Sequence, residues 1–157
     1  KDVGEVSDHY KRMMRNRGSF PAQHAFLAIK HSRYLLRVAN DTGAASRVIH
    51  QAIRKDKTNE QLYLQLVEIA LHEKPMEEAE ICQTFDFCIN SPDLRLPQKI
   101  RFSQRKLDFL EDFSSDVSKI QAHLLFHCRL IASDNPDPLN PRRTLPTLPE
   151  TQLKLLS

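Results

Sequence analysis

The chain has 157 residues, yet it contains no tryptophan, only three glycines and only three cysteines. Three cysteines cannot build a disulfide framework in a chain of this length, and free thiols fit a reducing compartment such as the nucleus or the cytosol. The three glycines form neither a G-x-G-x-x-G nor a G-x-x-x-x-G-K loop. The common phosphate-binding loops and a disulfide-stabilised fold are therefore excluded.

Long apolar runs and a large charge of one sign are also missing. No stretch of about 18 apolar residues is present, which excludes a transmembrane helix. The formal net charge of +3 is too small for a strongly basic arm that binds nucleic acid. No signal-peptide pattern follows Lys1, and we expect the sequence to be a fragment of a longer chain.

The residues that are present favour helices. The 20 leucines nearly equal the valines, isoleucines and threonines taken together, and strands need those β-branched residues and glycine-rich turns. The composition, 40% hydrophobic and 27% charged, is that of a globular domain. The sequence therefore predicts an all-α fold.

Proline and glycine positions divide the chain into amphipathic segments with a regular spacing. The predicted helices cover residues 6–17, 21–40, 42–55, 59–73, 76–90, 97–113 and 116–133. The last six form three pairs that begin at residues 21, 59 and 97. A constant period of this length is typical of an α-solenoid built from antiparallel helix hairpins.

This organisation predicts three regions. Residues 1–20 would form a helix that precedes the array, and residues 21–133 would form the three hairpins. Five of the nine prolines lie in residues 134–157, so we expect an extended or disordered tail there. In the last helix, the side chains expected to face inward are Val117, Ile120, Leu124, Cys128 and Ile131.

Several residue strings resemble known helical repeats. The half-a-tetratricopeptide (HAT) repeat, which is similar to the tetratricopeptide repeat, has a degenerate pattern that this sequence matches at Ala45, Arg47, Val48, Ile49, Ala52, Ile53, Leu62, Tyr63 and Leu66. The strings AIKHSRYLLRV from Ala28, AIRKDKTNEQLYL from Ala52 and IRFSQRKLDFLEDFSSDV from Ile100 resemble the C-terminal repeats of the pre-mRNA-processing factor 39 family. The resemblance covers about residues 25–120, although the tryptophan of the repeat consensus is absent.

The resemblance implies a nuclear splicing scaffold. Members of this family associate with the small nuclear ribonucleoprotein that recognises the five-prime splice site. The resemblance also implies an all-helical array that pairs with itself, as a homodimer, or with a related HAT protein. We therefore expect no catalytic activity and no cofactor.

Histidines near the end of the array have the spacing of metal ligands. His123 and His127 lie one turn apart and Cys128 follows, but the string HLLFH lacks the glutamate of a zinc-protease motif. No second ligand pair has a suitable spacing. We expect no metal site, and interpret the cysteines as small core residues and the histidines as partly exposed.

An apolar set on the helix over 97–113 is the candidate interface for a second copy or a partner. Its residues are Phe102, Lys106, Phe109, Leu110 and Phe113. At helical spacing such residues usually form core, but the outer side of a terminal repeat must be capped or paired. A two-fold contact would satisfy this need.

Two basic clusters form a candidate contact surface. They consist of Lys11, Arg12, Arg15 and Arg17, and of Lys99, Arg101 and Arg105. A solvated helix face explains them most simply, and an acidic protein or RNA phosphates could also bind there. Neither cluster has the aromatic platform on which single-stranded RNA stacks, so a module that binds RNA is the alternative function.

Overall fold

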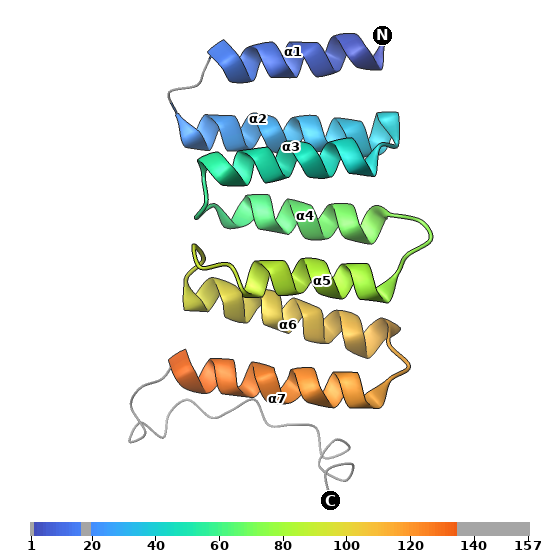
Figure 1. Cartoon of the computed structure of the whole chain (residues 1–157), viewed down its shortest axis with the longest axis vertical. Helices are drawn as coiled ribbons and strands as arrows, with labels where there is room; N and C mark the ends of the chain where they lie inside the picture. Colours follow the sequence, from blue (N-terminus) through green and yellow to red (C-terminus); the bar gives the residue numbers. More distant parts are fainter. Residues whose placement is uncertain (1, 17–19, 135–157) are drawn as a thin grey trace, which may run out of the picture.

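A computed structural model describes residues 2–16 and 20–134, and these residues form a single row of packed helices (Figure 1). The elements are α1 (Val3–Asn16), α2 (Pro21–Tyr34), η1 (Leu35–Ala39), α3 (Thr42–Lys55), α4 (Glu60–His72), α5 (Glu78–Ile89), α6 (Leu96–Phe113) and α7 (Val117–Asp134). Each helix runs antiparallel to the one before it and packs against it (Figure 1). The described residues contain no strand, so the predicted all-α solenoid is confirmed.

Side-chain caps fix where several helices begin. The Asp41 carboxylate accepts a hydrogen bond of 2.7 Å from the Ala44 backbone N–H, and Asn59 Oδ1 accepts one of 3.1 Å from Gln61. Asp116 caps α7 in the same way through the Ser118 N–H, at 2.9 Å. These polar side chains satisfy backbone donors that lack partners in the first turn of a helix.

The second predicted helix, over 21–40, ends in an unusual way. Its last turn is the π-helical η1, in place of a regular α-helical turn. Asn40 then takes a left-handed conformation with φ of 52°, which ends the helix one residue before the Asp41 cap. Asparagine tolerates this conformation better than most residues, and a tight corner results between α2 and α3.

The core runs along the row, between neighbouring helices. Its largest fully buried side chains are Tyr63, Phe85, Phe102, Leu36, Ile49, Leu62, Ile81 and Leu110. The Tyr63 hydroxyl donates to the Lys57 carbonyl oxygen at 2.8 Å and lies 3.1 Å from Ser91 Oγ, so its polar end is satisfied. The array is held together by contacts between successive helices.

Two sequence-based predictions need correction. The helix expected from residue 76 begins at Glu78, with Glu77 in the N-cap position, because the chain after Pro75 is still extended. In α7 the inward side is centred on His123 and His127, which are both buried, whereas Val117 is exposed and the other four predicted positions are only half-buried. Among the described helices, α7 packs mainly against α6, so one neighbour cannot cover the whole apolar arc.

Some predictions fall on residues outside the described part. These are the part of the predicted tail over 135–157 and the basic residue Arg17. In the described residues, no helix is both long and apolar enough to cross a lipid bilayer.

Candidate protein-interaction surface

The apolar set predicted on α6 divides into buried and exposed residues. Phe102, Phe109 and Leu110 belong to the core, where the Phe109 ring lies 6.2 Å from the Phe85 ring. These three side chains already contact other helices of the same chain, so they are not free to bind a partner. That part of the predicted interface is corrected: Phe102, Phe109 and Leu110 are buried on the inward side of α6, which packs against α5.

Phe113 is the one phenylalanine of the set that reaches the surface. It is 58% exposed at the last residue of α6, and its ring stacks on Phe109 with 5.2 Å between centroids. The rings of Phe85, Phe109 and Phe113 therefore contact one another in sequence, and the last of them is exposed to solvent. A residue in this position can contact a partner without any rearrangement of the core.

Lys106 is also largely buried, because it forms an ion pair inside the array. Its Nζ lies 2.7 Å from Asp86 Oδ1 on α5. The long aliphatic part of the side chain packs between the helices while the charged end meets a carboxylate. Lys106 thus joins α5 to α6 and is not part of an outer surface.

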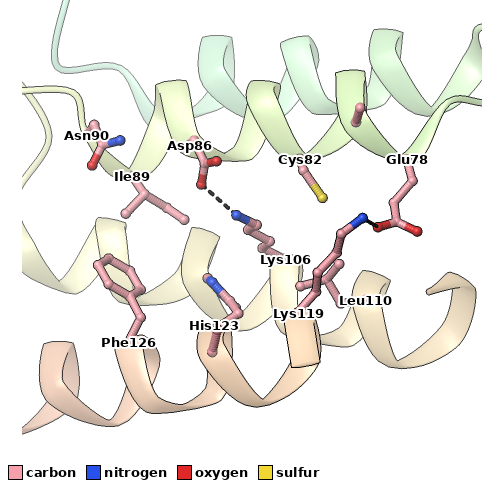
Figure 2. A pocket seen from close by; sticks show the side chains of 12 residues that line it. Glu78, Cys82, Asp86, Ile89, Asn90, Lys106, Leu110, Lys119, His123 and Phe126 are labelled. Carbon is pink, nitrogen blue, oxygen red and sulfur yellow. Dashed lines mark hydrogen bonds and ion pairs between the residues drawn. The ribbon is translucent and has the colours of Figure 1, made fainter. Parts of the chain in front are cut away.

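Figure 2 shows the hollow around this ion pair, which α5, α6 and α7 enclose. It has a volume of about 600 Å³. A second ion pair lies at its rim, where Lys119 Nζ is 3.0 Å from Glu78 Oε1. Cys82 also lines the hollow, and burial raises the pKa of its thiol. With each lysine engaged by a carboxylate, the hollow carries no unbalanced charge.

Buried histidines connect α7 to α6. His127 Nδ1 lies 2.9 Å from Ser103 Oγ, while His123 Nε2 lies 3.2 Å from the same hydroxyl and 2.9 Å from the Ser103 carbonyl oxygen. Burial lowers the pKa of both imidazoles, and His123 lowers the pKa of His127 further. The expectation of partly exposed histidines was therefore wrong: these side chains form a polar contact in the helix–helix interface.

Part of the remaining surface of α7 is apolar, beside exposed polar residues such as Ser118 and Arg129. Leu125 is 53% exposed, Val117 and Phe126 are exposed as well, and Leu124 and Cys128 are half-buried. Among the described helices, α7 packs mainly against α6. We call the set Val117, Leu124, Leu125 and Cys128 the outer face of α7. Such an unpartnered apolar face on a terminal helix is typical of a protein-interaction surface.

The two basic clusters lie on separate helices. Lys11, Arg12 and Arg15 are on α1, at one end of the row, whereas Lys99, Arg101 and Arg105 are on α6, near the other end (Figure 1). They therefore do not form one continuous surface.

Arg101, on α6, is also engaged within the chain. It donates two hydrogen bonds to Glu60, at 2.9 and 2.7 Å, and these hold the pKa of the Glu60 carboxyl below its usual value.

Sequence reasoning did not identify the partners of these charged and polar side chains. Ser103, Asp86 and Glu60 each contact a residue at least 20 positions away in the chain. Ser103 lies one turn before the buried Leu107, so its position in the inward stripe was the only local signal. Long-range pairs of this kind follow from how the hairpins stack, which no local pattern encodes.

Comparison with known proteins finds several similar proteins that share one name. The chain is 40% identical over 116 residues to pre-mRNA-processing factor 39 of Danio rerio, a match that covers 73% of this chain and 15% of that protein. It is 37% identical over 115 residues to the Xenopus laevis protein of the same name, covering 73% of this chain and 18% of the relative. For the Homo sapiens protein the identity is 37% over 97 residues, with 61% and 14% covered. The chain thus spans less than a fifth of the length of these relatives. No protein-family model matches the chain.

Proposed function

This chain belongs to the pre-mRNA-processing factor 39 family, and from that premise we propose that it is a non-enzymatic scaffold in nuclear pre-mRNA splicing. Its helices over 21–133, preceded by the helix within 1–20, would act as HAT-type hairpins that present surfaces to other proteins. The partners would be subunits of the small nuclear ribonucleoprotein that recognises the five-prime splice site.

The observation that supports this function best is the outer face of α7 together with Phe113. The outer face exposes Leu125 and Val117, and Phe113 stands exposed at the end of the neighbouring α6. Burying these side chains would remove apolar area from water and is favourable for association. A second copy of the chain, or a related HAT protein, supplies a matching apolar face through a two-fold contact.

The experiment is light scattering on the chain over a series of protein concentrations. A dimer gives a mass near twice 18.2 kDa, and Leu125→Asp or Phe113→Asp shifts it toward the monomer because a charge is placed in the contact. Both positions are exposed, so the single chain folds with either substitution. Circular dichroism of each variant verifies that the helices are retained.

Phe26→Asp is the matched control. Phe26 on α2 is 59% exposed, almost the same as Phe113, but it lies far from α7 in the row (Figure 1). The control leaves the mass unchanged if pairing uses the α6–α7 end. A monomer at every concentration contradicts self-pairing by this chain. Salt-sensitive binding of RNA through the basic clusters would favour the alternative, a helical-repeat module that contacts RNA.

A further inference from the structure

At the end of the row opposite to α7, a hollow of about 360 Å³ lies between α1, α2 and α3. Three cationic side chains line it: Lys11 from α1, and Arg54 and Lys55 from α3. Two histidines of α2, His24 and His31, line it as well. No aspartate or glutamate is among its lining residues.

The balance of charge distinguishes this hollow from others in the described part of the chain. In the hollow of Figure 2 each lysine is paired with a carboxylate. A hollow between α3 and α5 is lined by Glu73 and Glu80 without any lysine or arginine. Of the three cations, Lys11 forms an exposed ion pair, with its Nζ 3.8 Å from the Asp8 carboxylate. Arg54 and Lys55 form no ion pair with any described residue.

His31 adds an unsatisfied polar atom to this hollow. The residue is only 1% exposed, and its Nδ1 has no hydrogen-bond partner among the described residues. The other ring nitrogen, Nε2, lies 2.6 Å from Ser7 Oγ, and the ring stacks on Tyr10 at 5.1 Å. Buried polar atoms are normally hydrogen-bonded, so this nitrogen, buried in a residue that lines the hollow, is left with an unused hydrogen-bonding position.

The positive charge of the hollow affects the pKa values of the two histidines that line it. Burial lowers the pKa of His24 and His31, and the nearby Lys55 and Lys11 lower the two values further. His24 Nε2 lies 3.3 Å from Lys55 Nζ. Two neutral imidazoles and three cations thus surround one small space. An anion that enters would be attracted by the cations and could accept hydrogen bonds from them.

We propose that this hollow binds the phosphate group of a phosphorylated serine or threonine on a protein partner. Such a group carries close to two negative charges at neutral pH and presents three acceptor oxygens from a compact side chain. Arg54, Lys55 and Lys11 line the same small hollow, and their combined positive charge suits a single dianion. This inference does not depend on self-pairing, because the hollow and α7 lie at opposite ends of the row (Figure 1).

The hollow is less suited to RNA, which is the competing ligand. A nucleic-acid strand needs cations spaced along a track and exposed aromatic rings for its bases. Among the lining residues there is no phenylalanine, tyrosine or tryptophan. The nearby Tyr10 ring is already stacked on His31.

The test titrates the chain with O-phospho-L-serine and, separately, with unmodified L-serine, and follows backbone amide shifts by NMR. Phosphoserine should give saturable shifts in α1, α2 and α3 with millimolar affinity, and serine should give none. The double variant Arg54→Ala/Lys55→Ala should weaken binding about tenfold or more, since charge-assisted hydrogen bonds are lost. Both residues are exposed, so the fold is retained.

Arg47→Ala is the control for removal of an exposed cation from the same helix. Arg47 is an exposed arginine on the same helix, but it does not line the hollow, so this variant should bind phosphoserine as the unmodified chain does. Equal binding by the double variant, or the absence of saturable shifts, would overturn the proposal. So would tighter binding of a single-stranded uridine oligonucleotide that strengthens with length, because the surface would then recognise RNA.

Discussion

The stacked pair Phe109 and Phe113 allows a quantitative test of how α6 is oriented. Phe109 is 7% exposed and its ring packs between those of Phe85 and Phe113, whereas Phe113 is 58% exposed. We expect Phe109→Ala and Phe113→Ala to lower the free energy of unfolding by clearly different amounts. The substitutions are chemically identical and lie one turn apart, so only their burial differs.

The magnitudes follow from that burial. Truncation of a buried phenylalanine to alanine costs about 3–5 kcal/mol, through lost transfer energy and the cavity left behind. The higher helix propensity of alanine offsets about 0.5 kcal/mol of this. For Phe113, less than half of roughly 200 Å² is buried, so at about 25 cal/mol per Å² the loss is at most about 2 kcal/mol. The difference between the variants should therefore be about 2 kcal/mol.

Urea unfolding followed by far-ultraviolet circular dichroism measures both values. The slope of free energy against urea concentration should be the same for the two variants, so that the midpoints report stability alone. If Phe113→Ala lowers the free energy of unfolding as much as Phe109→Ala does, the orientation of α6 with Phe109 buried and Phe113 exposed is refuted. The outcome also decides which phenylalanine is suitable for testing association, since only a substitution that leaves the single chain folded can report on pairing.

Three further predictions concern particular side chains. Because burial holds the pKa of His123 and His127 below 6.5, the native state binds fewer protons than the unfolded state, so stability should fall as the pH drops below 6.5. Denaturant midpoints at a series of pH values check this, and the double variant His123→Gln/His127→Gln should depend less on pH; an equal dependence contradicts it. Asp41→Ala removes the cap of α3 and should cost about 1 kcal/mol in urea unfolding, whereas Asp41→Asn should cost little. Cys88 is buried and its thiol pKa is raised to about 12, so a thiol reagent at neutral pH should modify it last of the cysteines; early modification would show that it is accessible.

The positions of prolines and glycines between amphipathic segments were enough to predict most helices. Pro21 lies at the first turn of α2, and Asp41 and Asn59 cap α3 and α4 near the predicted starts of the helices over 42–55 and 59–73. These features act within a few residues, so a linear sequence displays them. The start of α5 was misplaced because proline at 75 is compatible both with a first helical turn and with an extended segment before one.

The inward side of α7 could not be predicted in the same way. Hydrophobicity selected Val117 and Leu124, but the interface is centred on His123 and His127, because Ser103 on α6 offers both rings a hydrogen-bond partner. An analysis of hydrophobic periodicity treats histidine as a polar, exposed residue. It cannot show that a hydrogen-bond partner on another helix allows the imidazole to be buried. The division of the predicted interface into buried Phe109 and exposed Phe113 has a related cause, since both lie in apolar positions and only the packing of α5 separates them.

Histidine–serine contacts occur at both ends of the described array. Ser7 of α1 meets His31 of α2, and Ser103 of α6 meets His123 and His127 of α7. Water can replace such hydrogen bonds when a helix separates, whereas it cannot replace the apolar contacts around Tyr63 and Phe85. The end helices should therefore open as separate cooperative units while the middle of the array stays closed, and their backbone amides should exchange with solvent deuterium first. The proposed phosphate-binding hollow, to which α1 contributes Lys11, would then be complete only while α1 is packed against α2.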